Sequence, residues 1–205
     1  MPPLLLQACN YLWPMPSQKI IIITAPSGAG KTSITRYLLS KFENLRFSIS
    51  ATTRPPRPYE QHGKDYYFLS LQQFQEHIKA GDFLEWEMVY EGKYYGTLRS
   101  EVFRMWQQHQ VPLLDIDVKG AIHIQQQFAR QCLSVFIEAP SLEALKSRLE
   151  NRGTETPETI ATRLNKASYE MSFKHHFNAV VVNDVLERAC EEVAQLVADF
   201  FAQPS

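Results

Sequence analysis

A glycine-rich loop near the start of the chain carries residue types that bind polyphosphates. Gly28 and Gly30 free the backbone N–H groups to point inward, and Lys31 can reach the β- and γ-phosphates of a nucleoside triphosphate. The hydroxyl of Thr32 can ligate Mg²⁺ in this arrangement. The sequence therefore predicts a triphosphate site made of Ala25, Pro26, Ser27, Gly28, Ala29, Gly30, Lys31 and Thr32.

The segments on either side of this loop are those that such a loop requires. Residues 20–24 are β-branched and predict a strand that is buried on both faces of a parallel sheet. Ile34, Leu38 and Leu39 follow at helical spacing, and the N-terminus of that helix adds a partial positive charge behind the loop. The alternative is a chance glycine-rich turn, against which the order of strand, loop and helix argues.

One position departs from the pattern G-x-x-x-x-G-K-[ST], because Ala25 stands where the first glycine is expected. If that position required a positive φ angle, alanine would cost on the order of 1 kcal/mol. We expect the loop to keep its function, since Gly28, Gly30 and Lys31 are all present.

Two arginines in a proline-rich segment form a second candidate phosphate site. Arg54 and Arg57 lie three residues apart, among prolines that favour a rigid extended loop. Planar guanidinium groups suit bidentate contact with phosphate, although such a pair alone would more often be a solvated basic loop. The block around them also contains a predicted helix, Leu71–Ala80, and a tyrosine-rich hairpin at residues 89–97. We interpret this block as an insertion between two elements of the parallel sheet.

Two aspartates lie near the end of an apolar segment, residues 111–118, that predicts a buried strand. Asp115 and Asp117 are two residues apart, so on a strand both would point to the same face. Aspartates at the end of a strand beside a phosphate loop suit either the surroundings of a Mg²⁺ ion or the recognition of a base. The alternative is ordinary turn chemistry at a strand end.

Three arginines follow in a predicted helix-turn-helix. Arg148 and Arg152 would share a helix face, and residues 153–157 break the helix before a second one that carries Arg163. Such an element could close over a triphosphate as a lid and supply positive charge, while the alternative is a solvated, salt-bridged surface.

The composition limits the classes of function. A chain of 205 residues, 44% of them hydrophobic, is long enough for one substantial core with small inserted units. A formal net charge of −1 gives no basic field for a nucleic acid polymer. Three widely spaced cysteines fit reduced thiols in a cytoplasmic protein, and no apolar run approaches the ~20 residues of a membrane span. Residues 1–18 are expected to be a poorly ordered extension, with Met15 as an alternative start.

In the order of phosphate loop, inserted block and arginine-rich lid, the chain resembles nucleoside monophosphate kinases. It resembles the guanylate kinase family most closely, from residue 19 to residue 201. The stretch SATTRPPRPYEQHGKDYYF at residues 50–68 is far more specific than a phosphate loop alone. The other matching stretches are APSGAGKT (25–32), FLEW (83–86), YYGT (94–97), LDIDVKG (114–120) and RLENRGTET (148–156).

The resemblance implies an α/β fold with the three-layer core of the P-loop NTPases around a parallel sheet. The core would comprise residues 19–49, 99–139 and 165–205. An inserted mixed-sheet subdomain that binds GMP would comprise residues 50–98, and a helical lid would comprise residues 140–164.

The resemblance also implies the residues of the acceptor site. Those expected to hold the phosphate of GMP are Arg54, Arg57, Tyr66 and Tyr95. Those expected to contact guanine are Ser50, Glu85, Thr97 and Asp117. This role suits a carboxylate, because guanine presents N1–H and N2–H donors side by side, whereas adenine has a lone pair at N1. Asn183 is expected near the adenine of the donor.

For catalysis, the resemblance implies ATP as the phosphoryl donor and Mg²⁺ as the cofactor. Thr32 would ligate the metal, and Asp115 would lie in the shell of residues around its ligands. The residues expected to neutralise charge during transfer are Lys31, Arg54, Arg148, Arg152 and Arg163. The expected partners are GMP and ATP, with no nucleic acid and no membrane, and the expected assembly is a monomer or homodimer.

Two alternative functions remain open at this point. Guanylate-kinase-like domains that do not catalyse act as binding modules, but such a module could dispense with Lys31 and the lid arginines, which this chain retains. A related kinase with another acceptor, such as a sugar phosphate, would keep the phosphate loop. Glu85, Thr97 and Asp117 argue for guanine instead.

Overall fold

The computed structural model describes residues 18–151 and 156–203, and it contains a five-stranded parallel sheet in the order β2-β7-β1-β8-β9. The strands are β1 (Ile20–Thr24), β2 (Leu45–Phe47), β7 (Val111–Asp115), β8 (Cys132–Glu138) and β9 (Ala179–Val182). The central strand β1 is buried along its whole length, with Ile22 paired to Leu114 on one side and to Ser134 on the other. This confirms the predicted buried strand ahead of the loop.

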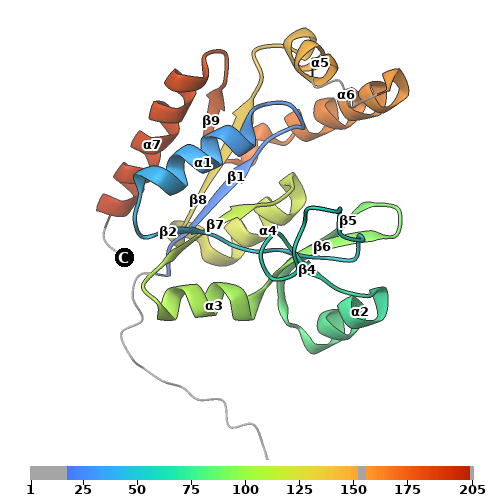
Figure 1. Ribbon diagram of the computed structural model, residues 1–205. Coiled ribbons are helices and arrows are strands. Elements are labelled where there is room, and N and C mark those ends of the chain that lie inside the picture. The colour runs from blue at the N-terminus through green and yellow to red at the C-terminus, as the bar shows by residue number, and fades with distance from the viewer. Residues whose placement is uncertain (1–17, 152–155, 204–205) are drawn as a thin grey trace, which may run out of the picture.

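Helices cover both faces of this sheet (Figure 1). On one face α1 (Lys31–Lys41) and α7 (Leu186–Ala202) pack against Ile21 and Ile23 of β1, and on the other α3 (Arg99–Gln107) and α4 (Val118–Phe128) pack against Ile20 and Ile22. The alternation of the isoleucines follows from the two-residue period of a strand. The predicted three-layer α/β core is therefore confirmed.

A second sheet of mixed direction lies at one end of the core, in the order β4-β3-β6-β5. Its strands are β3 (Ala51–Thr52), β4 (Tyr67–Phe68), β5 (Phe83–Tyr90) and β6 (Lys93–Leu98). It is covered by α2 (Leu71–Ala80), whose Phe74 stacks on Phe83 at 4.4 Å between ring centroids. The helix has the predicted bounds; Ser70 caps its start, and Gly81 ends it in the left-handed conformation.

Two helices, α5 (Leu142–Glu150) and α6 (Pro157–Met171), lie above the C-terminal ends of the parallel strands, on the side facing the second sheet (Figure 1). Ser141 caps α5, where its hydroxyl accepts a hydrogen bond from the N–H of Ala144. Because α6 continues to Met171, the predicted lid boundary at residue 164 falls inside a helix. Short 3-10 turns at Ala129–Gln131 and Lys174–His176 complete the described elements.

The structure corrects the interpretation of the two aspartates. The strand predicted for residues 111–118 ends at Asp115, and Asp117 is the N-cap of α4, where its carboxylate accepts a 2.8 Å hydrogen bond from the N–H of Gly120. The expectation that both aspartates share one strand face is therefore wrong. The capping conformation of Asp117 is favoured over a continued strand because its carboxylate satisfies one of the free N–H groups at the start of the helix. Residues 1–17 of the extension predicted at residues 1–18, and the lid residue Arg152, lie outside the described residues.

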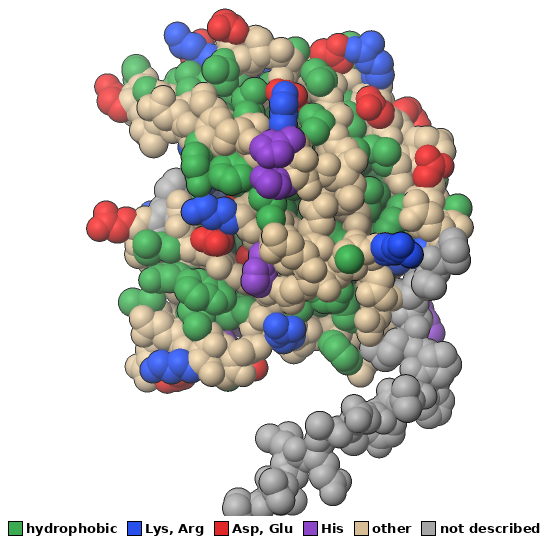
Figure 2. Space-filling model, turned by 180° about the vertical axis from the view of Figure 1, so that it is seen from behind, with side chains coloured by type: hydrophobic (Ala, Val, Ile, Leu, Met, Phe, Trp, Pro, Cys, Tyr) green, Lys and Arg blue, Asp and Glu red, His purple; other side chains and the backbone are tan. Residues whose placement is uncertain are grey.

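The reverse face of the molecule has interspersed basic and acidic side chains, as expected from the near-neutral net charge (Figure 2). Within residues 18–151 and 156–203, no helix combines the length and the apolar character needed to cross a bilayer.

Lys19 links the start of β1 to the end of α7 and provides a test of the core. Its buried ammonium donates hydrogen bonds to the carbonyl oxygens of Phe200 (2.9 Å), Phe201 (3.1 Å) and Gln203 (2.7 Å). We expect Lys19→Met to lower the free energy of unfolding by about 1–3 kcal/mol, because these carbonyls lose a charged donor. Urea unfolding measures the change. The control Lys41→Met, whose ammonium forms an exposed pair with Glu191, should lose far less, and equal losses would contradict the prediction.

Candidate functional site

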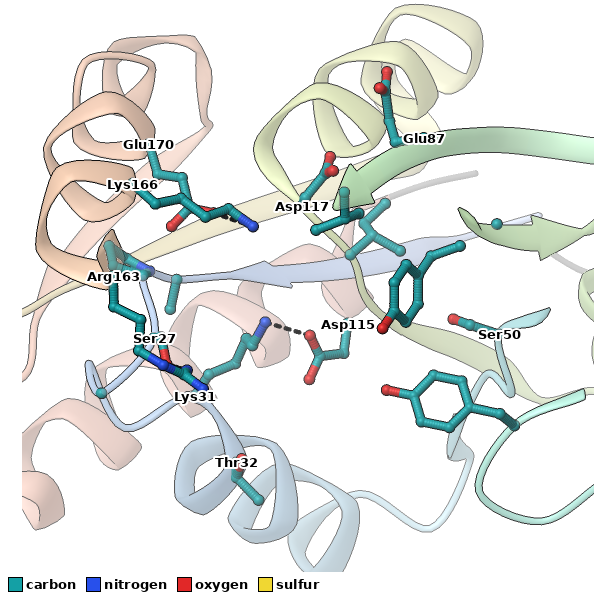
Figure 3. A pocket seen from close by; sticks show the side chains of 18 of the residues that line it. Ser27, Lys31, Thr32, Ser50, Glu87, Asp115, Asp117, Arg163, Lys166 and Glu170 are labelled. Carbon is teal, nitrogen blue, oxygen red and sulfur yellow. Dashed lines mark hydrogen bonds and ion pairs between the residues drawn. The ribbon is translucent and has the colours of Figure 1, made fainter. Parts of the chain in front are cut away.

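A cavity of about 450 Å³ opens at the C-terminal ends of β1 and β7, between α6 and the second sheet. Figure 3 shows the phosphate-loop residues Ser27, Lys31 and Thr32 on one side and Ser50 on the other. Residues from the predicted loop that line it are Ala25, Pro26, Ser27, Gly28, Gly30, Lys31 and Thr32. Residues from the predicted acceptor site that line it are Ser50, Arg57, Tyr66, Glu85, Tyr95 and Asp117. Asp115 and Arg163 also line it.

The phosphate loop has the backbone that the sequence predicts. Gly28 and Gly30 both have φ near 96°, a conformation that L-residues rarely adopt. Outside glycine, positive φ occurs among the described residues at His109 and Ala129. Ala25 therefore sits in an ordinary conformation, and the cost considered for the departure from the motif does not arise.

Lys31 and Asp115 form an ion pair at the centre of the cavity and point toward one another in Figure 3. Burial acts to lower the pKa of Lys31, but the charge of Asp115 and its hydrogen bond outweigh this, so the pKa of Lys31 is raised and the ammonium stays charged. The hydroxyl-bearing Thr32 is exposed at the first turn of α1 beside this pair. The structure thus brings together the predicted cation and the predicted oxygen donors.

Asn183 and Arg148 support the loop from outside the cavity. The buried amide of Asn183 donates to the carbonyl of Ala29 (2.7 Å), and it lies so close to Gly30 that a Cβ there would clash with it. Arg148 donates in turn to the backbone carbonyl of Asn183 (2.8 Å). Neither residue is among those that line the cavity. The expected position of Asn183 near adenine and the charge-neutralising role of Arg148 stay predictions.

One face of α6 contributes a row of charged side chains that sequence reasoning found only in part. Arg163 donates to the hydroxyl of Ser27 (2.5 Å), and Lys166 and Glu170 line the cavity beside it (Figure 3). Glu170 is buried and pairs with Lys166 at 3.6 Å, and burial raises the pKa of Glu170 despite that cation. Lys166 follows Arg163 by three residues and Glu170 follows Lys166 by four, and this helical spacing was the signal that could have found both.

Arg54 is held by an unpredicted partner, Glu60. The two side chains form a bidentate pair with hydrogen bonds of 2.7 and 2.9 Å, and the same carboxylate accepts from the backbone N–H of Arg57 at 2.7 Å. The pair with Arg54 lowers the pKa of Glu60 to about 2. The guanidinium of Arg54 also lies over the rings of Tyr66 and Phe68. Arg57 lines the cavity and Arg54 does not.

Glu60 was detectable in the sequence. It is the acidic residue three positions after Arg57 in the same proline-rich stretch that identifies the family resemblance. Its carboxylate orients one arginine and fixes the backbone at the other, so the loop presents both as a unit.

The far end of the cavity contains a buried carboxylate. Glu85, on β5, is 6% exposed and accepts a 2.6 Å hydrogen bond from the hydroxyl of Thr97 on the paired strand β6. Burial raises the pKa of Glu85 to about 7; the hydrogen bond from Thr97 opposes the shift, and the carboxylates of Asp117 and Glu87 add to it. Thr97 thus lies behind Glu85 rather than in the cavity lining. Glu87, two residues on along the same strand, lines the cavity and was not predicted.

These two ends lie in one continuous cavity, with the glycine-rich loop and Lys31 at one side and Arg57 and the buried carboxylate of Glu85 at the other. The arrangement suits transfer of a phosphoryl group between two bound nucleotides. Fold and site together define the class of P-loop nucleoside monophosphate kinases.

Comparison with known proteins narrows this class. The family model "Guanylate kinase" matches residues 17–200. The guanylate kinase of Bacteroides thetaiotaomicron is 46% identical over 182 residues, covering 89% of each chain, and that of Salinibacter ruber is 47% identical over 188 residues, covering 92% of this chain and all of the relative. The crystal structure of guanylate kinase from Anaplasma phagocytophilum superposes with a TM-score of 0.72 at 28% identity, covering 90% of this chain and 87% of that one. The chain belongs to the guanylate kinase family.

The raised pKa of Glu85 predicts a pH-dependent stability. Because the folded pKa of about 7 exceeds the ordinary value of 4.5, the folded state binds the proton more tightly than the unfolded chain. The stabilisation is fully present below about pH 4.5 and is lost as the pH rises through about 7, by up to about 3 kcal/mol. Glu85→Gln removes this titration.

Urea unfolding at pH 5 and pH 8 tests this effect of Glu85. The wild type should lose more stability than Glu85→Gln as the pH rises, while the exposed control Glu43→Gln should follow the wild type. Parallel behaviour of wild type and Glu85→Gln would show that the folded state does not perturb this carboxyl group.

Proposed function

We propose that this chain transfers the γ-phosphoryl group of ATP to GMP, giving ADP and GDP, and that the cavity described above is the place of transfer. The observation that carries the proposal is that one cavity contains both the phosphate-loop Lys31 and the buried carboxylate of Glu85. The first residue suits a triphosphate and the second suits guanine. The function accords with the family to which the chain belongs.

The base of GMP would be recognised by Glu85 and Asp117, with Ser50 beside them. An ionised Glu85 can accept both N1–H and N2–H of guanine, and the two hydrogen bonds would favour the charged form that burial disfavours. Adenine offers a lone pair at N1, so it would leave the carboxylate unpaired in a buried site. Thr97 would act on the base through Glu85, because its hydroxyl holds one carboxylate oxygen.

The phosphate of GMP would be held by the arginine loop and two tyrosines. Arg57, Tyr66 and Tyr95 line the cavity, and the rings of Tyr66 and Tyr95 approach each other edge to face at 6.2 Å between centroids. Each tyrosine supplies a neutral donor on a rigid ring, and Arg57 supplies charge. Arg54 would add a second cation once the loop closes on the phosphate.

In the transfer step, an oxygen of the GMP phosphate attacks the γ-phosphorus of ATP in line with the leaving ADP oxygen. The attacking oxygen is already anionic near neutral pH, so no general base is needed. Lys31 and Arg163 would stabilise the charge that spreads over the transferring group, with Arg148 and Arg152 as further cations from the lid. Lys31 would exchange its pairing with Asp115 for the phosphates.

The residues at the loop fit a Mg²⁺ ion. Thr32 and Asp115 supply a hydroxyl and a carboxylate, which are the hard oxygen donors that this cation prefers, and both line the cavity. Bound Mg²⁺ would neutralise charge on the β- and γ-phosphates during transfer. Asp115 would contact it through bound water.

We further propose that the enzyme acts in the cytoplasm, as a monomer or homodimer, within purine nucleotide metabolism. The buried, unpaired cysteines Cys132 and Cys190 fit a reducing compartment. The balanced charge of the chain gives no support for nucleic acid binding.

A coupled assay of ADP release tests the proposed function. With Mg²⁺-ATP, we expect turnover with GMP, at least 100-fold weaker turnover with AMP or dTMP, and loss of activity in Lys31→Ala. Glu85→Gln should lose the preference for GMP, because an amide offers only one acceptor to the two donors of guanine. No turnover with any acceptor, despite GMP binding, would indicate a binding module, and better turnover with another acceptor would indicate a different kinase.

Glu60 provides a test of the phosphate site. We expect Glu60→Gln to raise the KM for GMP about tenfold, since one hydrogen bond to Arg54 or to the backbone of Arg57 is lost. The KM for ATP should stay nearly constant, because the triphosphate loop lies on the other side of the cavity. Steady-state kinetics with each substrate varied in turn measures both values. An equal rise in both would mean that Glu60 maintains the fold rather than the acceptor site.

A further inference from the structure

Gly120 lies in the first turn of α4, against the carboxylate of Glu85. It is buried, and a Cβ built on it would lie 2.5 Å from Oε2 of Glu85 and 3.0 Å from its Cδ. Ordinary contacts of a Cβ begin near 3.4 Å. Any side chain at this position would therefore displace the carboxylate by roughly an ångström.

The backbone of Gly120 gives no other reason for a glycine. Its φ angle is not positive, and it sits inside a helix, where alanine is more favourable by about 1 kcal/mol. Its N–H donates to the capping carboxylate of Asp117, a bond that alanine would make equally well. The close approach to Glu85 is thus the local feature that requires a residue without a side chain at position 120.

Glu85 has little freedom to move away from a new methyl group. Its other carboxylate oxygen is held by Thr97 at 2.6 Å, and α4 is tied to β5 by a 3.0 Å hydrogen bond from Gln127 to the carbonyl of Leu84. The helix of the core and the strand of the inserted sheet therefore pack directly against each other beside the carboxylate.

We propose that Gly120 is a positioning residue for base specificity: the space left by its missing side chain allows Glu85 to accept both N1–H and N2–H of guanine. This inference rests on the proposed function. To accept from two adjacent donors, both carboxylate oxygens must lie in line with the two N–H bonds of the base. Hydrogen bonds weaken steeply when they are misaligned. A displaced carboxylate would keep one bond and lose the other.

The test compares GMP with IMP, which keeps N1–H but lacks the 2-amino group. We expect Gly120→Ala to lower kcat/KM for GMP by 10- to 100-fold, mainly through KM, and to reduce the preference for GMP over IMP. Lys119→Ala introduces alanine one position earlier, on the exposed side of the turn. It should leave kcat/KM for GMP and the preference for GMP over IMP within about twofold of the wild type. The melting temperature of Gly120→Ala should change little, because the gain in helix propensity offsets part of the cost of displacing Glu85.

A double-mutant cycle with Glu85→Asp separates positioning from general damage. The aspartate carboxylate is drawn back by one methylene, so adding Gly120→Ala in that background should cost less than threefold. An equal cost in both backgrounds, or unchanged GMP preference in Gly120→Ala, would overturn the proposal. If Gly120→Ala fails to fold, recovery of the folded state by Glu85→Asp supports it, and continued failure overturns it. A wild type that does not phosphorylate GMP would instead contradict the proposed function.

Discussion

The burial of one carboxylate, that of Glu85, is the interaction on which the account of this molecule depends. An ionised group away from water is unfavourable unless donors compensate it, and burial accordingly raises the pKa of Glu85 to about 7. Elements far apart in the sequence converge on it: Thr97 from β6, and Gly120 at the start of α4. In the proposed complex, guanine would bring two donors to this carboxylate, and an incorrect base would leave its charge uncompensated.

At the phosphate-loop end of the cavity, the gathered charge is positive rather than negative. The left-handed glycines of the loop, Lys31 and Arg163 collect positive charge at the C-terminal edge of the parallel sheet. Asp115 orients Lys31 by an ion pair. In the neighbouring loop, Glu60 orients Arg54 in the same way. Paired cations remain oriented and charged, and phosphate oxygens can replace or join their partners. Such preorganisation reduces the reorganisation required during phosphoryl transfer.

The sequence was informative wherever local chemistry dictates local structure. The β-branched run of β1, the glycines of the loop and the bounds of α2 were all predictable, and the β-branched run indicated a parallel sheet. The failure at Asp117 has a physical reason, since a capping aspartate ends strand alternation at a point that apolar residues alone do not mark. The pairs of Glu60 with Arg54 and of Glu170 with Lys166 are local and have sequence signals, whereas the position of Glu170 in the cavity depends on tertiary structure, which periodicity does not encode. Gly120 and Glu85 lie 35 residues apart in the sequence, so their close approach could not be predicted from local patterns and is visible only in the three-dimensional structure.

A crystal structure with GMP, Mg²⁺ and an unreactive ATP analogue would test the central claim most directly. We expect N1 and N2 of guanine to lie about 2.7–3.2 Å from the two carboxylate oxygens of Glu85, with the triphosphate in the loop around Lys31. A complex in which the base of GMP lies elsewhere, with Glu85 still bound to Thr97 and facing no donor, would contradict it.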